Sequence, residues 1–297
     1  MARDVAIEHG RPKHRHAELA QRVLSAAVLV PGALVLAWAG EAYFTAGLIL
    51  LGAVVIAEWF RMISVPLSSI AFAVALAVLV AASIGADYRG AGFAALVLIV
   101  GSVLTAAAVT AVAAAGRTRR SVRFWAAGGL AYAGFGTVSF IALRHGDDGF
   151  AAILFVFAVS WATDVFAYFV GRTIGGPKLW PAVSPKKTWS GAIGGAVAAA
   201  AAGALLALGL SLPLTLIGVL IFCALSAIAQ LGDLFESGAK RRFGIKDSSR
   251  LIPGHGGLMD RVDGLLAAGV LALVIGSLVH GPLEPAVGVL TAIGAFQ

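Results

Sequence analysis

Charged residues are scarce in this chain. Asp, Glu, Lys and Arg make up 12% of its 297 residues, whereas hydrophobic residues make up 60%, and the mean hydropathy is +0.93. This composition offers too little polar surface to cover a soluble globule. The single cysteine, Cys223, lies within an apolar run, which excludes an intrachain disulfide and a cysteine-based metal cluster. The sequence therefore indicates an integral membrane protein.

Apolar runs recur along the chain, each near the ~20 residues that a spanning helix needs. They cover residues 23–40, 42–60, 65–86, 92–115, 124–143, 149–171, 190–210, 212–232 and 262–281. None shows the alternating pattern of a barrel strand, so helices are the remaining way to pair the backbone within a bilayer. We predict an all-α integral membrane protein, a polytopic bundle of about nine transmembrane helices. Residues 1–22 form a basic cytoplasmic arm and 23–297 a single membrane domain, in which 282–297 is too short for a tenth span.

The basic residues predict the orientation of this bundle. With the N-terminus in the cytoplasm, 20 of the 22 Lys and Arg residues fall on the cytoplasmic side, and Arg89 and Arg144 fall on the other. The net charge of +7 is then explained by topology and by anionic lipid or phosphate, so no nucleic-acid partner is expected. We expect a multi-pass protein of the cell's inner (plasma) membrane, with the loops at 171–191 and 231–263 facing the cytoplasm.

Two acids lie within the apolar runs. Glu58 lies near the cytoplasmic end of the second run, just before Arg61, and an interfacial ion pair explains it as well as a functional role does. Asp164 lies deeper, where an unpaired charge costs ~3 kcal/mol or more, so it should face the bundle interior and find a partner. Either it makes a structural hydrogen bond there or it belongs to a polar cavity.

The loop at 171–191, GRTIGGPKLWPAVSPKKTWSG, combines glycine and proline with polar residues. Its lysines include Lys186 and Lys187, and the hydroxyl groups of Ser184, Thr188 and Ser190 lie beside them at the start of the seventh run. Ammonium and hydroxyl groups near a helix N-terminus suit an anion, especially phosphate. A plain positive-inside loop would explain the lysines but not the polar cluster.

The stretch 231–263, LGDLFESGAKRRFGIKDSSRLIPGHGGLMDRVD, holds the densest charge. Four of its residues share one face of a helix that continues the eighth span: Asp233, Glu236, Ser237 and Lys240. Asp260 and Asp263 share another face at the start of the ninth span. Carboxylates together with phosphate oxygens are the ligands that Mg²⁺ prefers. A zinc site is disfavoured, because His255 in the glycine turn PGHGGL is the single histidine here and no cysteine is near.

The same stretch resembles a known signature. SGAKRRFGIKDSSRLIPGHGGLMDRVD is similar to the pattern of phosphatidate cytidylyltransferases, also called CDP-diacylglycerol synthases. The similarity extends to LGDLFES before it and to DVFAYFVGR and SPKKTWSG upstream, which covers the C-terminal half, whereas the N-terminal helices match only in character. The family commonly has Glu where this chain has Ser190, so Ser190 receives no catalytic role.

The resemblance implies transfer of the cytidylyl group of CTP to phosphatidate, giving CDP-diacylglycerol and pyrophosphate. It also implies Mg²⁺ held by Asp233 and Asp260, a second, monovalent cation nearby, and a homodimer. The residues predicted to hold metal or to act on the reacting phosphates are Asp233, Lys240, Arg241, Lys246, Asp247, Asp260, Arg261 and Asp263. The residues predicted to bind substrate are Asp164, Ser184, Lys186, Lys187, Thr188, Ser237, His255, Gly256 and Gly257.

Two other functions fit the same features. A CTP-dependent lipid kinase would use similar residues but would transfer the γ-phosphate. A secondary transporter of an organic anion would also use many spans and a buried acid, but the sequence shows no inverted repeat and no matching broken helices.

Overall fold

Long apolar helices dominate the computed structural model, which describes residues 27–114, 122–252 and 256–294. Within these ranges, eight helices are long and apolar enough to cross a membrane. They are α2 (Glu41–Met62), α3 (Ile70–Arg89), α4 (Ala91–Ala114), α5 (Arg123–Arg144), α6 (Gly149–Thr173), α7 (Trp189–Gly209), α8 (Leu216–Arg242) and α9 (Met259–His280). The all-α polytopic prediction is confirmed. The predicted arm, 1–22, and His255 lie outside the described residues.

The ends of the chain carry two shorter helices. An apolar helix, Ala27–Trp38, falls within the first predicted span. The nine-residue α10 (Pro285–Ile293) follows α9. At ~1.5 Å per residue α10 is about 14 Å long, less than half the thickness of a bilayer core. It is therefore not a tenth span, as the length of 282–297 predicted.

Local sequence marks where several helices begin and end. The N-caps Ser69, Thr188 and Thr215 each accept a hydrogen bond from the backbone N–H three residues on, at 3.3, 3.1 and 3.0 Å. Gly90 and Gly281 follow α3 and α9 with φ of 82° and 97°, a conformation that side chains disfavour. The polar loops are thus set off sharply from the apolar spans.

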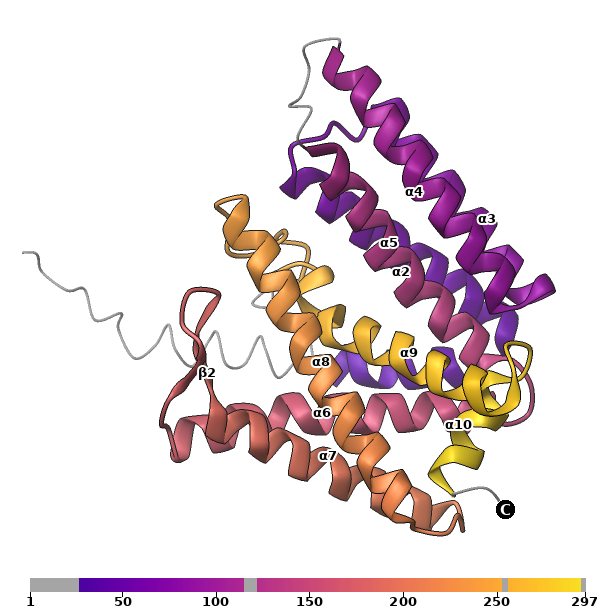
Figure 1. Cartoon of the computed structure of the whole chain (residues 1–297), viewed down its shortest axis with the longest axis vertical. Helices are drawn as coiled ribbons and strands as arrows, with labels where there is room; N and C mark the ends of the chain where they lie inside the picture. The colour runs from indigo at the N-terminus through magenta and orange to yellow at the C-terminus, as the bar shows by residue number, and fades with distance from the viewer. Residues whose placement is uncertain (1–26, 115–121, 253–255, 295–297) are drawn as a thin grey trace, which may run out of the picture.

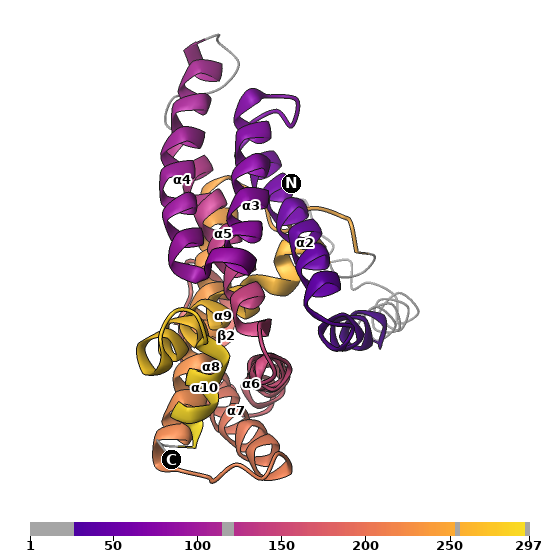
Figure 2. The same ribbon diagram turned by 90° about the vertical axis from the view of Figure 1, so that its right-hand side faces the viewer.

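Helix α5 lies at the centre of the bundle. It packs against α2, α3, α4, α6 and α9. Figure 1 shows α3 and α4 as one pair of neighbouring helices and α6 and α7 as another, with α8 crossing α6 and α7. Figure 2 shows α9 and α10 next to α8. Helices α9 and α10 therefore pack on α5, and α8 packs on α9.

The fully buried Trp59 of α2 joins three helices. Its indole Nε1 donates to the carbonyl oxygen of Trp125, in α5, at 2.7 Å. Its ring lies 5.6 Å from the ring of Tyr132, also in α5, and 6.1 Å from the ring of Phe235, in α8. This aromatic contact holds the end of α2 against α8, next to the charged residues described below.

Helices α8 and α9 approach closely through small residues. A Cβ on Gly232 would lie 2.6 Å from the Cβ of Ala267 and 2.8 Å from the carbonyl oxygen of Asp263. A Cβ on Gly264 would lie 2.8 Å from the carbonyl oxygen of Ala229. Since no side chain fits between them, the two backbones hold the acids of both helices close to one another.

A short hairpin connects α6 to α7. Strand β1 (Lys178–Trp180) pairs antiparallel with β2 (Ser184–Thr188), so that Lys178 is opposite Thr188. The sequence predicted only a loop here. Proline has no backbone N–H to donate and is tolerated mainly in edge strands. Both strands of a two-stranded sheet are edge strands, so β2 can contain Pro185. Figure 1 shows the hairpin projecting beyond the ends of α6 and α7.

Candidate functional site

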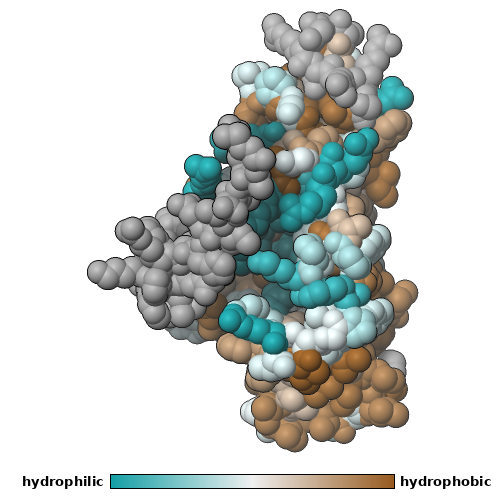
Figure 3. All heavy atoms as spheres, turned by 90° about the vertical axis from the view of Figure 1, so that its left-hand side faces the viewer, coloured by the Kyte–Doolittle hydropathy of each residue, from teal (hydrophilic) through white to brown (hydrophobic). Residues whose placement is uncertain are grey.

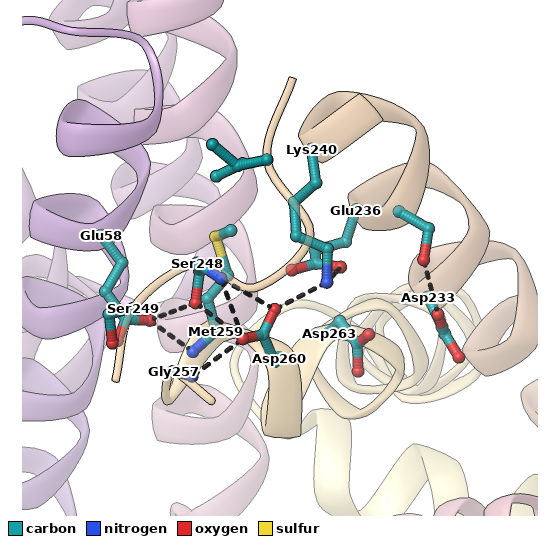
Figure 4. Close-up of polar contacts among 12 residues, drawn as sticks. Glu58, Asp233, Glu236, Lys240, Ser248, Ser249, Gly257, Met259, Asp260 and Asp263 are labelled. Carbon is teal, nitrogen blue, oxygen red and sulfur yellow. Dashed lines mark hydrogen bonds and ion pairs between the residues drawn. The ribbon is translucent and has the colours of Figure 1, made fainter. Parts of the chain in front are cut away.

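Asp260, in the first turn of α9, is held by donors from three directions. Its Oδ2 accepts hydrogen bonds from the backbone N–H of Ser248 at 3.0 Å and of Gly257 at 2.8 Å. The Ser248 hydroxyl lies 3.1 Å from the same oxygen. The other oxygen, Oδ1, lies 2.6 Å from Nζ of Lys240 in α8 (Figure 4). The carboxylate therefore has a fixed orientation at the start of a helix, where the helix dipole favours negative charge.

Lys240 bridges two acids. Its Nζ lies 2.6 Å from Oε2 of Glu236, one turn back on α8, and 2.6 Å from Oδ1 of Asp260. The Glu236 side chain is fully buried, and its Oε1 has no hydrogen-bond partner among the described residues. An unpartnered carboxylate oxygen in a buried site attracts a further cation or donor. Figure 4 shows Lys240 between the two acids.

Asp233 connects the stretch 231–263 to the loop 171–191. Its Oδ2 lies 2.5 Å from Nζ of Lys187, in β2, and its Oδ1 accepts from the Ser237 hydroxyl at 3.2 Å. Residues about fifty positions apart in the sequence thus meet at one end of the bundle. The loops 171–191 and 231–263, which the sequence predicted to lie on the same side of the membrane, are in contact.

Glu58, on α2, fastens the loop that precedes α9. Its Oε1 accepts from the Ser249 hydroxyl at 2.5 Å and from the backbone N–H of Leu258 at 3.0 Å. Its Oε2 accepts from the Ser248 hydroxyl at 3.1 Å and from the backbone N–H of Met259 at 2.7 Å. Because no side chain of its own segment caps α9, a carboxylate from another helix supplies the cap.

The ion pair with Arg61, one of the two explanations of Glu58 that the sequence left open, is not formed. Arg61 is exposed, and Glu58 is 1% exposed and turned toward the loop 243–258. Sequence reasoning gave neither Glu58 nor Ser248 a place in the site. The available signal was an acid inside an apolar run, which a bundle retains at a cost. Its partners could not be found from the sequence, because they lie about 190 residues away.

The glycine turn lets the backbone approach these acids. Gly256 has φ 85°, and a Cβ there would lie 2.7 Å from Oδ2 of Asp260. A Cβ on Gly257 would lie 1.9 Å from the Ser248 hydroxyl oxygen and 2.6 Å from Oε1 of Glu58. The two glycines therefore shape the turn around carboxylates, which is a different role from the predicted contact with a substrate anion.

Asp164, on α6, is exposed, whereas the sequence placed it in the bundle interior. The neighbouring Thr163 takes the buried position instead and donates to the Ser226 hydroxyl at 2.8 Å. Asp164 interacts electrostatically with Asp233, Lys187 and Arg261. It forms no structural hydrogen bond with the described residues, so it belongs to the open polar face beside Asp233.

Asp263 lies one turn after Asp260 on α9. Its Oδ1 accepts from the backbone N–H of Gly264 at 2.8 Å, and its carboxylate interacts electrostatically with Asp233 and Asp164. In Figure 4 it lies between Asp260 and Asp233. The acids that the sequence assigned to separate faces of α8 and α9 therefore come together.

Other residues of the two predicted loops make contacts within the protein. Thr188 is buried, and its hydroxyl caps α7. Ser190 donates to the carbonyl oxygen of Gly175 and lies 3.0 Å from the Thr188 hydroxyl. Arg241 is exposed and donates to the carbonyl oxygen of Ile245 at 3.2 Å. The predicted residues for which the described part of the chain shows no polar side-chain contact are Ser184, Lys186, Lys246 and Asp247.

Acids outnumber bases at the end of the bundle where α2, α6, α8, α9 and the hairpin meet. The carboxylates are those of Glu58, Asp164, Asp233, Glu236, Asp260 and Asp263, and the cationic side chains among them are those of Lys187, Lys240 and Arg261. Figure 3 shows hydrophilic residues gathered over the middle of the face on the side of the hairpin, with hydrophobic surface below them. Carboxylates and cationic side chains gathered in this way can hold a cation and phosphate groups.

The fold and this site define a polytopic membrane protein with an acid-rich polar centre. Residues 20–279 match the model of the cytidylyltransferase family, and the chain belongs to that family. The resemblance found in the sequence is confirmed.

Named relatives agree with the family. The chain is 42% identical over 270 residues to the phosphatidate cytidylyltransferase of Brucella suis biovar 1 (strain 1330), which covers 90% of this chain and 96% of that protein. It is 42% identical over 267 residues to that of Brucella abortus biovar 1 (strain 9-941), covering 89% and 95%. The phosphatidate cytidylyltransferase of Staphylococcus haemolyticus (strain JCSC1435) is 44% identical over 138 residues, covering 46% of this chain and 52% of that protein.

Proposed function

We propose that this protein transfers the cytidylyl group of CTP to phosphatidate, giving CDP-diacylglycerol and pyrophosphate. The observation that carries the proposal is the meeting of Lys187 with Asp233, and of Lys240 with Asp260, in a member of the cytidylyltransferase family. The relatives that match most of its length are named phosphatidate cytidylyltransferases.

The reaction suits residues that position charge. An oxygen of the phosphatidate phosphate attacks the α-phosphorus of CTP, a new P–O bond forms, and the bond from the α-phosphorus to the bridging oxygen breaks as pyrophosphate leaves. The attacking oxygen is already ionised near neutral pH, so neither a protein nucleophile nor a strong base is needed. Catalysis then rests on alignment of two polyanions and on stabilisation of their charge. Lys187, Lys240 and Arg261 would supply that positive charge.

The donor set fits the predicted magnesium ion. Asp233 and Asp260 would hold it together with phosphate oxygens and water, since Mg²⁺ usually takes one or two protein carboxylates. The excess of acids and the unpartnered Oε1 of Glu236 support a bound cation. When bound, the ion would neutralise charge on the phosphates. A monovalent cation and a homodimer are further parts of the proposal.

We place the site on the cytoplasmic side of the inner membrane. The basic residues support this orientation, because Arg89 and Arg144 end α3 and α5 on the side away from Asp260. CTP would then arrive from the cytoplasm. The acyl chains of phosphatidate would stay in the bilayer while the headgroup reaches Lys187 and Lys240.

The position of the transferred label tests the reaction. Detergent-purified protein is incubated with phosphatidate, Mg²⁺ and CTP labelled at either the α- or the γ-phosphate, and the lipid is extracted. We expect label in lipid from α-labelled CTP alone. Label from γ-labelled CTP would instead identify a lipid kinase, and no labelled lipid from either would contradict an enzyme of this type.

A further inference from the structure

A second polar cluster lies at the opposite ends of the helices. Glu41 is the first residue of α2, Asp87 lies in the last turn of α3, and His145 is the C-cap of α5. One ligand atom of each lies within 4.8 Å of the other two, and no other trio of His, Cys, Asp or Glu in the described ranges was found this close. Glu41 and Glu58 are 17 positions apart on α2, which places the cluster about 25 Å from the catalytic residues.

Two of the three side chains are already oriented toward one another. Nδ1 of His145 lies 3.0 Å from Oε2 of Glu41. The other oxygen, Oε1, accepts from the backbone N–H of Gly146 at 2.9 Å. This bond fixes the Glu41 carboxylate and leaves Oε2 directed at the centre of the cluster, as outer contacts of metal ligands do.

Asp87 contributes a carboxylate with no cationic partner. It makes no hydrogen bond or ion pair with the described residues. The nearby arginines contact other groups, since Nε of Arg144 donates to the carbonyl oxygen of Ala37 at 2.7 Å and the Arg89 guanidinium lies 5.9 Å from the centre of the Phe93 ring. Two carboxylates therefore share one imidazole, and within the described residues neither carboxylate pairs with a lysine or arginine.

The cluster borders a pocket of about 390 Å³. Asp87 and His145 line it, together with Tyr88, Pro282 and Leu283. A metal ion held by three protein ligands needs at least one more, and the pocket has room for water in that position.

We propose that Glu41, Asp87 and His145 bind a divalent transition-metal cation, with Zn²⁺ as the probe, and so fasten the ends of α2, α3 and α5. Ligand atoms about 2.0–2.1 Å from a tetrahedral Zn²⁺ lie about 3.3 Å apart. The separation of 3.0 Å between Nδ1 of His145 and Oε2 of Glu41 is near this value, and the carboxylate of Asp87 lies within 4.8 Å of both. Imidazole favours Zn²⁺ over Mg²⁺, so this site differs in selectivity from the catalytic one.

Zinc titration of the full-length protein in detergent tests the site. All proteins have the affinity tag removed and carry glutamine at the three histidines of the N-terminal arm, which could bind Zn²⁺ themselves: His9, His14 and His16. The variants are Asp87→Asn and His145→Gln. The matched control is Asp147→Asn, an exposed acid two residues beyond His145. Calorimetry gives the affinity, and thermal unfolding with and without Zn²⁺ gives the stabilisation.

We expect one Zn²⁺ ion that raises the melting temperature of the parent and of the Asp147→Asn protein. Loss of one ligand should weaken binding at least about tenfold in Asp87→Asn and His145→Gln, since even outer contacts are worth that much. Cytidylyl transfer measured without Zn²⁺ should be the same in all four proteins. Equal zinc affinity in all four, or no zinc binding by the parent, would overturn the proposal and leave an ordinary His–Glu ion pair.

Discussion

Replacing Glu58 with glutamine keeps the size of the side chain and changes what it can accept. Each carboxylate oxygen accepts from one hydroxyl and one backbone N–H: Ser249 and Leu258 on Oε1, Ser248 and Met259 on Oε2. The amide nitrogen cannot accept, so in either orientation one buried backbone N–H loses its partner, although a hydroxyl can rotate. An unsatisfied buried donor costs about 1–3 kcal/mol, and loss of a negative charge at a helix N-terminus adds about 0.3–1 kcal/mol.

The lost hydrogen bond destabilises the segment that positions Asp260. Ser248 contacts both Glu58 and Asp260, and Met259 precedes Asp260 in α9. If about 2 kcal/mol of this cost raises the activation free energy because Asp260 is displaced, the rate falls roughly thirtyfold. We expect kcat for cytidylyl transfer to fall by that order, with a smaller change in the KM for CTP.

The assay measures the formation of labelled lipid from α-labelled CTP and phosphatidate, and thermal unfolding is measured on the same preparations. Arg61→Gln is the matched control, since Arg61 lies one turn away on α2 and is exposed. Glu58→Asp, which keeps the charge, should restore part of kcat. A Glu58→Gln protein with kcat within twofold of the parent would refute the reasoning, and a lower melting temperature with unchanged kcat would reduce Glu58 to a structural residue.

Other substitutions test the neighbouring contacts. Lys187→Ala should reduce transfer far more than Lys186→Ala, because Lys187 contacts Asp233 at 2.5 Å and Lys186 is exposed; equal effects would contradict the pairing. Lys240→Met should lower the free energy of unfolding by about 3–5 kcal/mol, since it leaves two buried acids without their cationic partner. Adding Glu236→Gln should restore stability but not activity, as thermal unfolding and the lipid assay would show. Gly232→Ala should cost about 1–3 kcal/mol by pushing α8 from α9, and an unchanged melting temperature would argue against that close contact.

The helices could be predicted because a bilayer leaves few alternatives. A run of about twenty apolar residues must be helical to pair its backbone, and α2 to α9 follow the predicted runs closely. The continuation of α8 to Arg242 was also predicted, from the spacing of Asp233, Glu236 and Lys240. The bias of basic residues placed the two polar loops on one side, and the contact of Lys187 with Asp233 agrees with it.

The parts of the site that the sequence did not predict depend on tertiary contacts. Glu58 has a basic neighbour in sequence, so a local ion pair explained it equally well, and nothing in the sequence indicated Ser248 or the start of α9 as its partners. Asp164 was placed inside the bundle because charge is costly in lipid. The rotation of α6 buries Thr163 against α8 instead and turns Asp164 to the polar face. Helix rotation is set by packing, and hydropathy does not reveal it.

The most direct test is transfer from α-labelled CTP to phosphatidate by the purified protein and by its Asp260→Asn variant, with Mg²⁺ present. Asparagine keeps the size of the side chain and removes the charge that pairs with Lys240 and would hold the metal ion. The account predicts labelled CDP-diacylglycerol with an equal amount of pyrophosphate from the parent and at least about a hundredfold less from the variant, a loss of about 2.7 kcal/mol in transition-state stabilisation. Transfer by the variant at the parental rate, or no labelled lipid from the parent, would contradict it.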